Sequence, residues 1–131
     1  MRGLQLLVVD DDESLRRWLR RVFADVTFVY LAADAGEARA ALEEFAFDVV
    51  LCDHSMPGES GLAFLTHLAA VAPETRRVLF TADPPAAATS ALEEGQLSAI
   101  VEKPARMGPL REVTLQPWLE REVEPASSAG P

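Results

Sequence analysis

The stretch Leu4-Gln5-Leu6-Leu7-Val8-Val9-Asp10-Asp11-Asp12 decides the fold class of this chain of 131 residues. It is an almost unbroken apolar run that ends in three acids. A strand that is buried on both faces of a parallel sheet shows no polar alternation, so residues 4–9 are predicted to form such a strand. A helix is expected to follow over residues 13–23, because apolar residues recur there at steps of three and four and Asp12 can cap the first turn.

The same alternation of strand and helix continues along most of the chain. Further strands are expected at residues 26–31, 49–52, 77–81 and 99–102, and further helices at residues 34–45, 62–68 and 85–94. Asp34 and Glu37 have the spacing of a capping box at the start of the second helix. Five strands that alternate with helices favour a three-layer α/β fold with a parallel five-stranded sheet and right-handed crossovers.

The end of the chain is less regular than the rest. Gly108, Pro109 and Pro117 interrupt the stretch in which a fifth helix would close the domain. Pro109 can begin a helix, whereas Pro117 is expected to kink or split it. We therefore assign residues 1–123 to one domain. Residues 124–131 are dominated by proline, alanine, serine and glycine, which is typical of a disordered tail or a truncated linker.

The composition argues against several classes of protein. With 21 acidic and 12 basic residues, the net charge is -9, and direct binding to a nucleic-acid backbone needs positive charge. No run resembles a signal peptide or reaches the length of a membrane span, so no membrane association is expected. The single cysteine, Cys52, cannot form an internal disulfide and is expected in the core, which favours a cytoplasmic location.

Polar residues with useful chemistry follow four of the predicted strands. Asp10 and Asp11 come after the first strand, Asp53 after the third, Thr81 at the end of the fourth and Lys103 after the fifth. Open parallel sheets bind ligands at this edge. Two carboxylates about 4 Å apart repel by roughly 4 kcal/mol at an effective dielectric near 20, and a bound cation would relieve this repulsion. Carboxylate oxygens with room for water suit Mg²⁺, and the lysine and the hydroxyl complete a site for a phosphoryl group.

The motifs at these strand ends resemble those of response-regulator receiver domains, from about Leu4 to Pro104. They are Val8-Val9-Asp10-Asp11-Asp12, Asp53-His54-Ser55-Met56-Pro57-Gly58 followed by Gly61-Leu62, Phe80-Thr81-Ala82, and Lys103-Pro104. Each motif alone is weak, but together, in this order and at strand ends, they are highly specific. With this resemblance we expect the flavodoxin-like, doubly wound form of the fold, with strand order 2-1-3-4-5.

The resemblance implies a phosphorylation switch of bacterial two-component signalling. Asp53 would take a phosphoryl group from a phosphohistidine on a sensor histidine kinase or a phosphotransfer protein. Such a domain catalyses only its own phosphorylation and dephosphorylation, and is therefore not an enzyme acting on a separate substrate. It controls a downstream protein or output domain and can form a homodimer.

The resemblance also implies how a metal ion and the phosphoryl group are bound. Oxygen atoms would hold Mg²⁺, directly from Asp11, Asp53 and the backbone carbonyl of Ser55, and through water from Asp10. Thr81 and Lys103 would contact the phosphoryl oxygens, and the Lys103-Pro104 peptide bond would be cis.

One position departs from the family pattern, and two other functions stay open. Receiver domains usually have an aromatic residue three positions before the lysine, which swings inward as the threonine moves, and this chain has Ile100 there. A pseudo-receiver that signals without phosphate is therefore one alternative. The other is a haloacid-dehalogenase-type phosphatase, whose Asp-x-Asp motif would make Asp10 the nucleophile. His54 is taken as an exposed loop residue without a special role.

Overall fold

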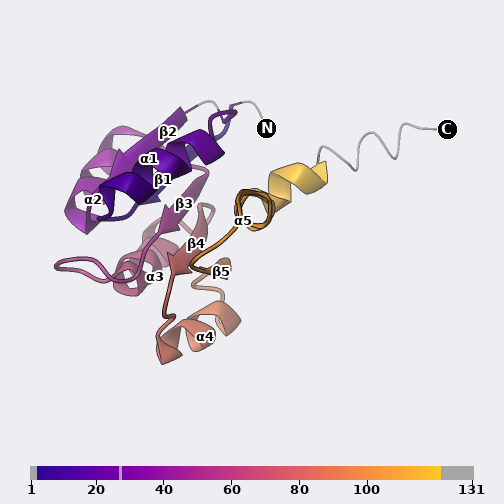
Figure 1. The fold of residues 1–131 in the computed structure, drawn as a ribbon. Coiled ribbons are helices and arrows are strands. Elements are labelled where there is room, and N and C mark those ends of the chain that lie inside the picture. Colours follow the sequence, from indigo (N-terminus) through magenta and orange to yellow (C-terminus); the bar gives the residue numbers. More distant parts are fainter. Residues whose placement is uncertain (1–2, 27, 122–131) are drawn as a thin grey trace.

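Strands and helices alternate along the computed structural model, which describes residues 3–26 and 28–121 (Figure 1). The strands are β1 (Gln5–Val9), β2 (Phe28–Ala32), β3 (Val49–Cys52), β4 (Arg76–Thr81) and β5 (Ala99–Glu102). The helices are α1 (Glu13–Val22), α2 (Ala35–Glu44), α3 (Gly61–Val71), α4 (Ala86–Glu93) and α5 (Met107–Thr114). All strand pairs are parallel, and their order is β2-β1-β3-β4-β5, which confirms the predicted topology.

The helices cover both faces of the sheet. Residues of α2, α3 and α4 form one hydrophobic core with strand residues such as Leu7 and Val9, and α1 and α5 form the other with Leu6 and Val8. Cys52 belongs to the first core, as predicted, and burial raises the pKa of its thiol. Because both faces are covered, β1, β3 and β4 are buried almost throughout, which explains the apolar runs at residues 6–9, 49–52 and 78–80.

Side chains cap the first two helices as the sequence predicts. Asp12 accepts a hydrogen bond from the backbone N–H of Leu15 at 3.1 Å. Asp34 accepts one from the N–H of Glu37 at 2.8 Å, and the Glu37 carboxylate accepts one from the N–H of Ala33 at 2.7 Å. The bonds to Asp12 and Asp34 satisfy N–H groups that have no partner inside the helix, and so fix where α1 and α2 begin. The expected capping box is only half formed, because Glu37 accepts from the N–H of Ala33 and not from that of the N-cap Asp34.

The second strand begins two residues later than the sequence suggests. Val26 was expected to open it, but its N–H donates to the carbonyl of Phe23 at 3.0 Å, in the turn that ends α1. Pairing with β1 starts at Phe28, whose N–H donates to the carbonyl of Leu4 at 3.3 Å. Propensity alone could not reveal this turn, because Val26 is apolar and buried, which fits a strand as well as a turn.

The last helix breaks next to Pro117. Helix α5 ends at Thr114, Leu115 is a turn residue, and residues 116–121 are helical again. Proline has no N–H to donate to the carbonyl four residues earlier, that of Val113. The Arg76 guanidinium replaces this donor, with bonds of 2.7 Å to the Val113 carbonyl and 3.1 Å to the Thr114 carbonyl. The start of β4 thereby stabilises the break in the helix.

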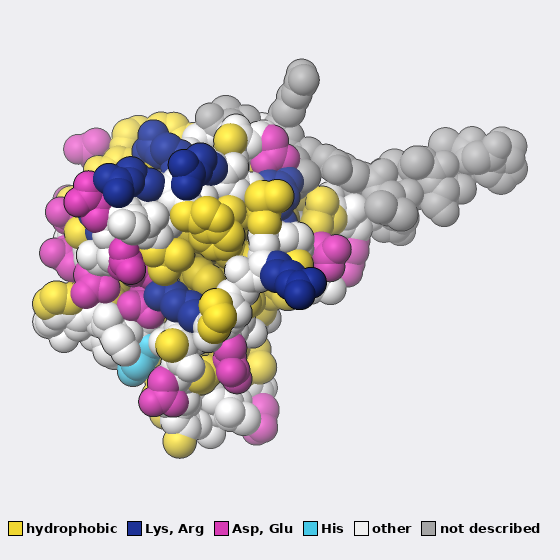
Figure 2. All heavy atoms as spheres, in the orientation of Figure 1, with side chains coloured by type: hydrophobic (Ala, Val, Ile, Leu, Met, Phe, Trp, Pro, Cys, Tyr) yellow, Lys and Arg dark blue, Asp and Glu magenta, His cyan; other side chains and the backbone are white. Residues whose placement is uncertain are grey.

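Basic side chains are concentrated on one helix of this acidic chain. Helix α1 carries Arg16, Arg17, Arg20 and Arg21, and Figure 2 shows a group of basic side chains over this helix. The net charge of -9 is therefore unevenly distributed. None of the helices within residues 3–26 and 28–121 has both the length and the apolar composition needed to cross a bilayer. The domain boundary expected at residue 123 lies outside the described residues.

Candidate functional site

The carboxyl ends of neighbouring strands bring the predicted site residues together. The register pairs Val9 of β1 with Cys52 of β3, so Asp10 and Asp53, which follow them, are neighbours at the sheet edge. The N–H of Asp53 donates to the carbonyl of Val9 at 2.8 Å, and the N–H of Lys103 donates to the carbonyl of Thr81 at 3.0 Å. The backbone pairing therefore continues one residue past the strands and fixes where these side chains start.

Three carboxylates form a cluster at this edge. Asp10, Asp11 and Asp53 each offer one oxygen, and these oxygens all lie within 4.8 Å of one another. Asp10 and Asp53 are buried, whereas Asp11 is exposed. Oxygen ligands in a partly open cluster match the preferences of a hard divalent cation that keeps some of its water. The donor set therefore fits Mg²⁺.

Lys103 pairs with the two buried carboxylates of this cluster. Its ammonium Nζ lies 2.7 Å from Oδ2 of Asp10 and 3.3 Å from Oδ1 of Asp53. Within the described residues, no other lysine or arginine forms an ion pair with either carboxylate. Asp10 also accepts a hydrogen bond from the N–H of Asp12 at 3.0 Å. The repulsion among these carboxylates favours a bound cation, and the Lys103 ammonium already supplies part of the positive charge.

Burial and pairing shift the pKa values of this ion pair. Burial raises the pKa of Asp10 above its usual range, although the hydrogen bond from Lys103 opposes the shift. Burial lowers the pKa of Lys103, but the hydrogen bond to Asp10 and the charges of Asp10 and Asp53 outweigh it, so that the net shift is upward. Lys103 is therefore a permanent positive charge at neutral pH, while ionised Asp10 is destabilised by its surroundings.

We expect Asp10→Asn to raise the free energy of unfolding of the metal-free protein at neutral pH. A carboxyl whose pKa is raised by folding destabilises the folded state once it is ionised. Below the ordinary value of 3.8, parent and variant should be equally stable, and the advantage of the variant should grow as pH rises through the folded-state pKa. Denaturant unfolding with a chelator present, between about pH 3 and 8, measures this difference.

Asp12→Asn is the control for this prediction, because it removes the same charge two residues away but keeps a side chain that can cap α1. It should not reproduce the pH-dependent gain. An Asp10→Asn protein that is less stable than the parent at pH 7 would contradict the account of Asp10.

The two residues expected to act as a switch lie on neighbouring strands. Thr81 is buried at the end of β4. Ile100 of β5 pairs in register with Leu79 of β4 and packs against the core that contains α4. The position usually held by an aromatic ring is thus filled by a partly buried aliphatic side chain. The Lys103-Pro104 peptide bond is cis, as the resemblance implies.

His54 has a local role that its sequence context did not indicate. This side chain was expected to be exposed, but it is partly buried, and its Nδ1 accepts a hydrogen bond from the N–H of Leu62 at 3.3 Å. It therefore helps to cap α3, together with Ser60, whose hydroxyl accepts a hydrogen bond from the N–H of Ala63 at 3.2 Å. Ser55 lies in the loop between these groups and is exposed.

Two further residues support the site, and sequence analysis assigned neither a separate role. Gly61 was quoted only as part of a motif, yet a Cβ atom there would lie 1.9 Å from the carbonyl oxygen of Asp53. The Arg16 guanidinium donates to the carbonyl of Asp10 at 2.7 Å. A glycine at the start of a helix could have indicated the close approach at Gly61. Nothing in the sequence indicated the contact of Arg16 with the Asp10 carbonyl.

The family model described as the response regulator receiver domain matches residues 6–114. The chain belongs to this family. It is 37% identical over 76 residues to the hydrogenase transcriptional regulatory protein HoxA of Cupriavidus necator, a match that covers 58% of this chain and 16% of HoxA. It is 44% identical over 84 residues to the virulence sensor protein BvgS of Bordetella pertussis, with 60% of this chain and 7% of BvgS covered.

A solved structure shows the same fold over nearly the whole chain. The signal receiver domain of an HD domain-containing protein from Pseudomonas fluorescens Pf-5 superposes with a TM-score of 0.77 at 26% identity, and the match covers 93% of this chain and 94% of that one. This receiver domain thus spans only a small part of the curated relatives that it matches.

Proposed function

We propose that this receiver domain takes a phosphoryl group onto Asp53 and changes conformation in response. The observation that carries the proposal is the cluster of Asp10, Asp11 and Asp53 with Lys103 in contact with two of them. A carboxylate nucleophile between a permanent cation and a set of metal ligands can form an acyl phosphate. HoxA and BvgS are a regulatory and a sensor protein by name, which supports a role in signalling.

Each side chain has a defined part in this reaction. A carboxylate oxygen of Asp53 attacks phosphorus, the bond from phosphorus to the donor nitrogen breaks, and its electron pair leaves with the imidazole of the phosphohistidine. Lys103 donates to a phosphoryl oxygen, and the Thr81 hydroxyl donates to another once it turns toward the phosphoryl group. Ile100 lacks an aromatic ring, so we expect the change to stay near the loop after Thr81 and the start of α4.

A metal site made by this chain completes the proposal. Asp11, Asp53 and the backbone carbonyl of Ser55 would hold Mg²⁺ directly, and Asp10 through water. When bound, Mg²⁺ supplies positive charge next to the transferring oxygens. The partners would be a sensor histidine kinase or phosphotransfer protein and a downstream protein or output domain, in the cytoplasm. The domain would modify only itself and act on no separate substrate.

Incubation with Mg²⁺ and the small phosphodonor phosphoramidate tests the proposal. Intact-mass spectrometry should show one added phosphoryl group that is lost at alkaline pH, and Asp53→Asn should abolish it. If the parent gains no phosphoryl group, the pseudo-receiver is the better reading. If the protein instead turns over small phosphate esters, with activity lost in Asp10→Asn and kept in Asp53→Asn, it is a phosphatase of the haloacid-dehalogenase type.

A further inference from the structure

The loop between β3 and α3 carries part of the proposed metal site. It begins at Asp53 and reaches Gly61, the first residue of α3. Its backbone is pinned at one point, because the carbonyl of His54 accepts hydrogen bonds from the N–H groups of Met56 and Gly61, at 3.1 and 3.0 Å. Between them the chain turns through Gly58, whose φ of 78° favours glycine. These bonds close the loop on itself, because both join residues within it or at its end.

Besides the packing of Met56 against the core that contains α3, one polar side chain from another element contacts this loop. Arg39 of α2 pairs with Glu59 through both carboxylate oxygens, with Nη2 at 2.6 and 2.8 Å and Nε at 3.1 Å. Within residues 3–26 and 28–121, no other side chain from outside the loop hydrogen-bonds to residues 55–60. The pair thus links residues 20 positions apart in the chain.

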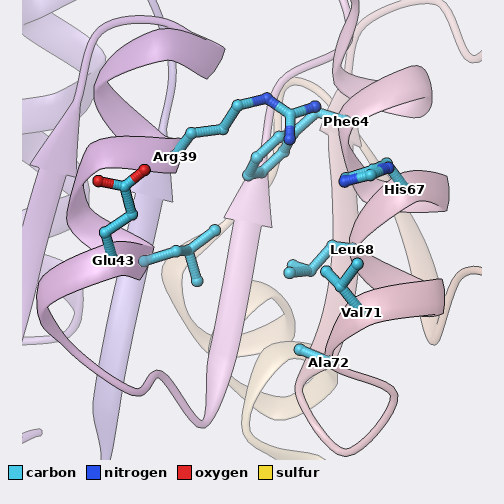
Figure 3. Close-up of a pocket in the computed structure, with 8 residues that line it drawn as sticks. Arg39, Glu43, Phe64, His67, Leu68, Val71 and Ala72 are labelled. Carbon is cyan, nitrogen blue, oxygen red and sulfur yellow. The ribbon is translucent and has the colours of Figure 1, made fainter.

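A second contact holds the Arg39 side chain in place. Its guanidinium carbon lies 5.3 Å from the centre of the Phe64 ring, and Phe64 is buried in the first turns of α3. Figure 3 shows Arg39 extending from α2 toward this ring on α3, across the pocket that lies between the two helices. A guanidinium that forms a two-pronged bond with a carboxylate and lies against an aromatic ring has little conformational freedom left. It can therefore fix where the Glu59 carboxylate lies, in addition to neutralising its charge.

We propose that Arg39 is a positioning residue for the metal site: it anchors Glu59 and thereby aligns the loop that presents the Ser55 carbonyl next to Asp53. The inference rests on the proposed function, since it concerns the metal site proposed for that reaction. Arg39 touches neither phosphoryl group nor metal. It acts through Glu59 and the few residues between Glu59 and Ser55.

If Arg39 acts only through its charge, its removal should change Mg²⁺ affinity in one direction, and if it acts as an anchor for the loop, in the other. Removing the positive charge of Arg39 should strengthen the binding of a nearby cation, because the Glu59 carboxylate is then unpaired. Removing an anchor should weaken binding, because the loop must be ordered when the metal binds. Folding stability should change little in either case, since the two side chains are 39% and 32% exposed and such pairs contribute little. The sign of the change in metal affinity therefore separates the two roles.

Calorimetric titration of the unphosphorylated protein with Mg²⁺ provides the test. We expect Arg39→Gln to weaken Mg²⁺ binding about tenfold, the lower end of the effect of groups that orient metal ligands. Arg39→Lys keeps the charge but loses the fork, so it should recover part of the affinity. Arg17→Gln is the matched control, because Arg17 forms an exposed pair with Glu13 on α1 at 3.0 Å, and its loss should not weaken binding.

The outcomes separate this inference from the proposed function. Unchanged or tighter Mg²⁺ binding in Arg39→Gln, with a parent that binds Mg²⁺ and is phosphorylated, overturns the role of Arg39 alone. A parent that binds no Mg²⁺ overturns the metal site and this inference together. Denaturant midpoints measured without Mg²⁺ establish that both Arg39 variants are folded, and equal losses in Arg39→Gln and Arg17→Gln would also reject the anchor.

Discussion

Gly61→Ala should destabilise the protein by about 3 kcal/mol, the upper end of the usual cost of overpacking. The new Cβ would lie 1.9 Å from the carbonyl oxygen of Asp53, 2.7 Å from its carbonyl carbon and 2.9 Å from Cα of His54. All three are backbone atoms, so no flexible side chain can move aside. Either α3 or the segment that contains Asp53 must shift, and denaturant unfolding measures the cost.

Gly108→Ala is a matched control for this effect. Gly108 lies in the first turn of α5, and a Cβ there would meet no atom within 4 Å. Alanine is a better helix former than glycine, so this variant should be as stable as the parent or slightly more stable. If Gly61→Ala unfolds at the same midpoint as Gly108→Ala, the close approach of α3 to Asp53 is not a constraint.

The position of the site followed from the sequence because it depends on local signals. Apolar runs without alternation indicate buried parallel strands, and polar residues directly after Val9, Cys52 and Glu102 must lie at one edge of such a sheet. The parallel register then brings Asp10 and Asp53 together. Neither step needs knowledge of how the helices pack.

The contacts that support the site could not be predicted from the sequence, because no sequence pattern indicates that the residues in each pair lie next to one another. Arg39 and Glu59 are 20 positions apart, and each alone is typical of an exposed charge. Arg76 replaces the N–H that Pro117 lacks, although the proline indicated only that a helix would break. Such pairs depend on how α2 and α5 sit on the sheet, which is a property of the packed core.

The start of β2 shows the same limit on a smaller scale. An apolar residue such as Val26 fits a buried turn as well as a strand, and a backbone bond to Phe23 decides between them. The strand instead begins at Phe28, whose ring packs against Phe45 and Phe47 beyond α2, at centroid distances of 5.1 and 6.3 Å. Burial was therefore predictable at these positions, but the boundary was not.

Lys103→Met should destabilise the metal-free protein by roughly 3 kcal/mol, because removing one partner of a buried ion pair leaves the other charge uncompensated. Asp10 and Asp53 have side chains that are 2% and 8% exposed, and both lose their cation in this variant. The loss should shrink as pH falls, since protonation of the carboxyls removes the repulsion. It should also shrink in millimolar Mg²⁺, if the three carboxylates form a metal site.

Phosphorylation of the same variant should respond in the opposite way. In the proposed function a bound metal would restore positive charge and stability, but it would not replace the ammonium that donates to a phosphoryl oxygen. We therefore expect phosphoramidate to label Lys103→Met at least about tenfold more slowly than the parent in saturating Mg²⁺, the effect of one charge-assisted hydrogen bond. Arg17→Met, which removes an exposed cation on α1, should be labelled at the parental rate. Parental labelling of Lys103→Met would show that this lysine serves the fold and not the transfer.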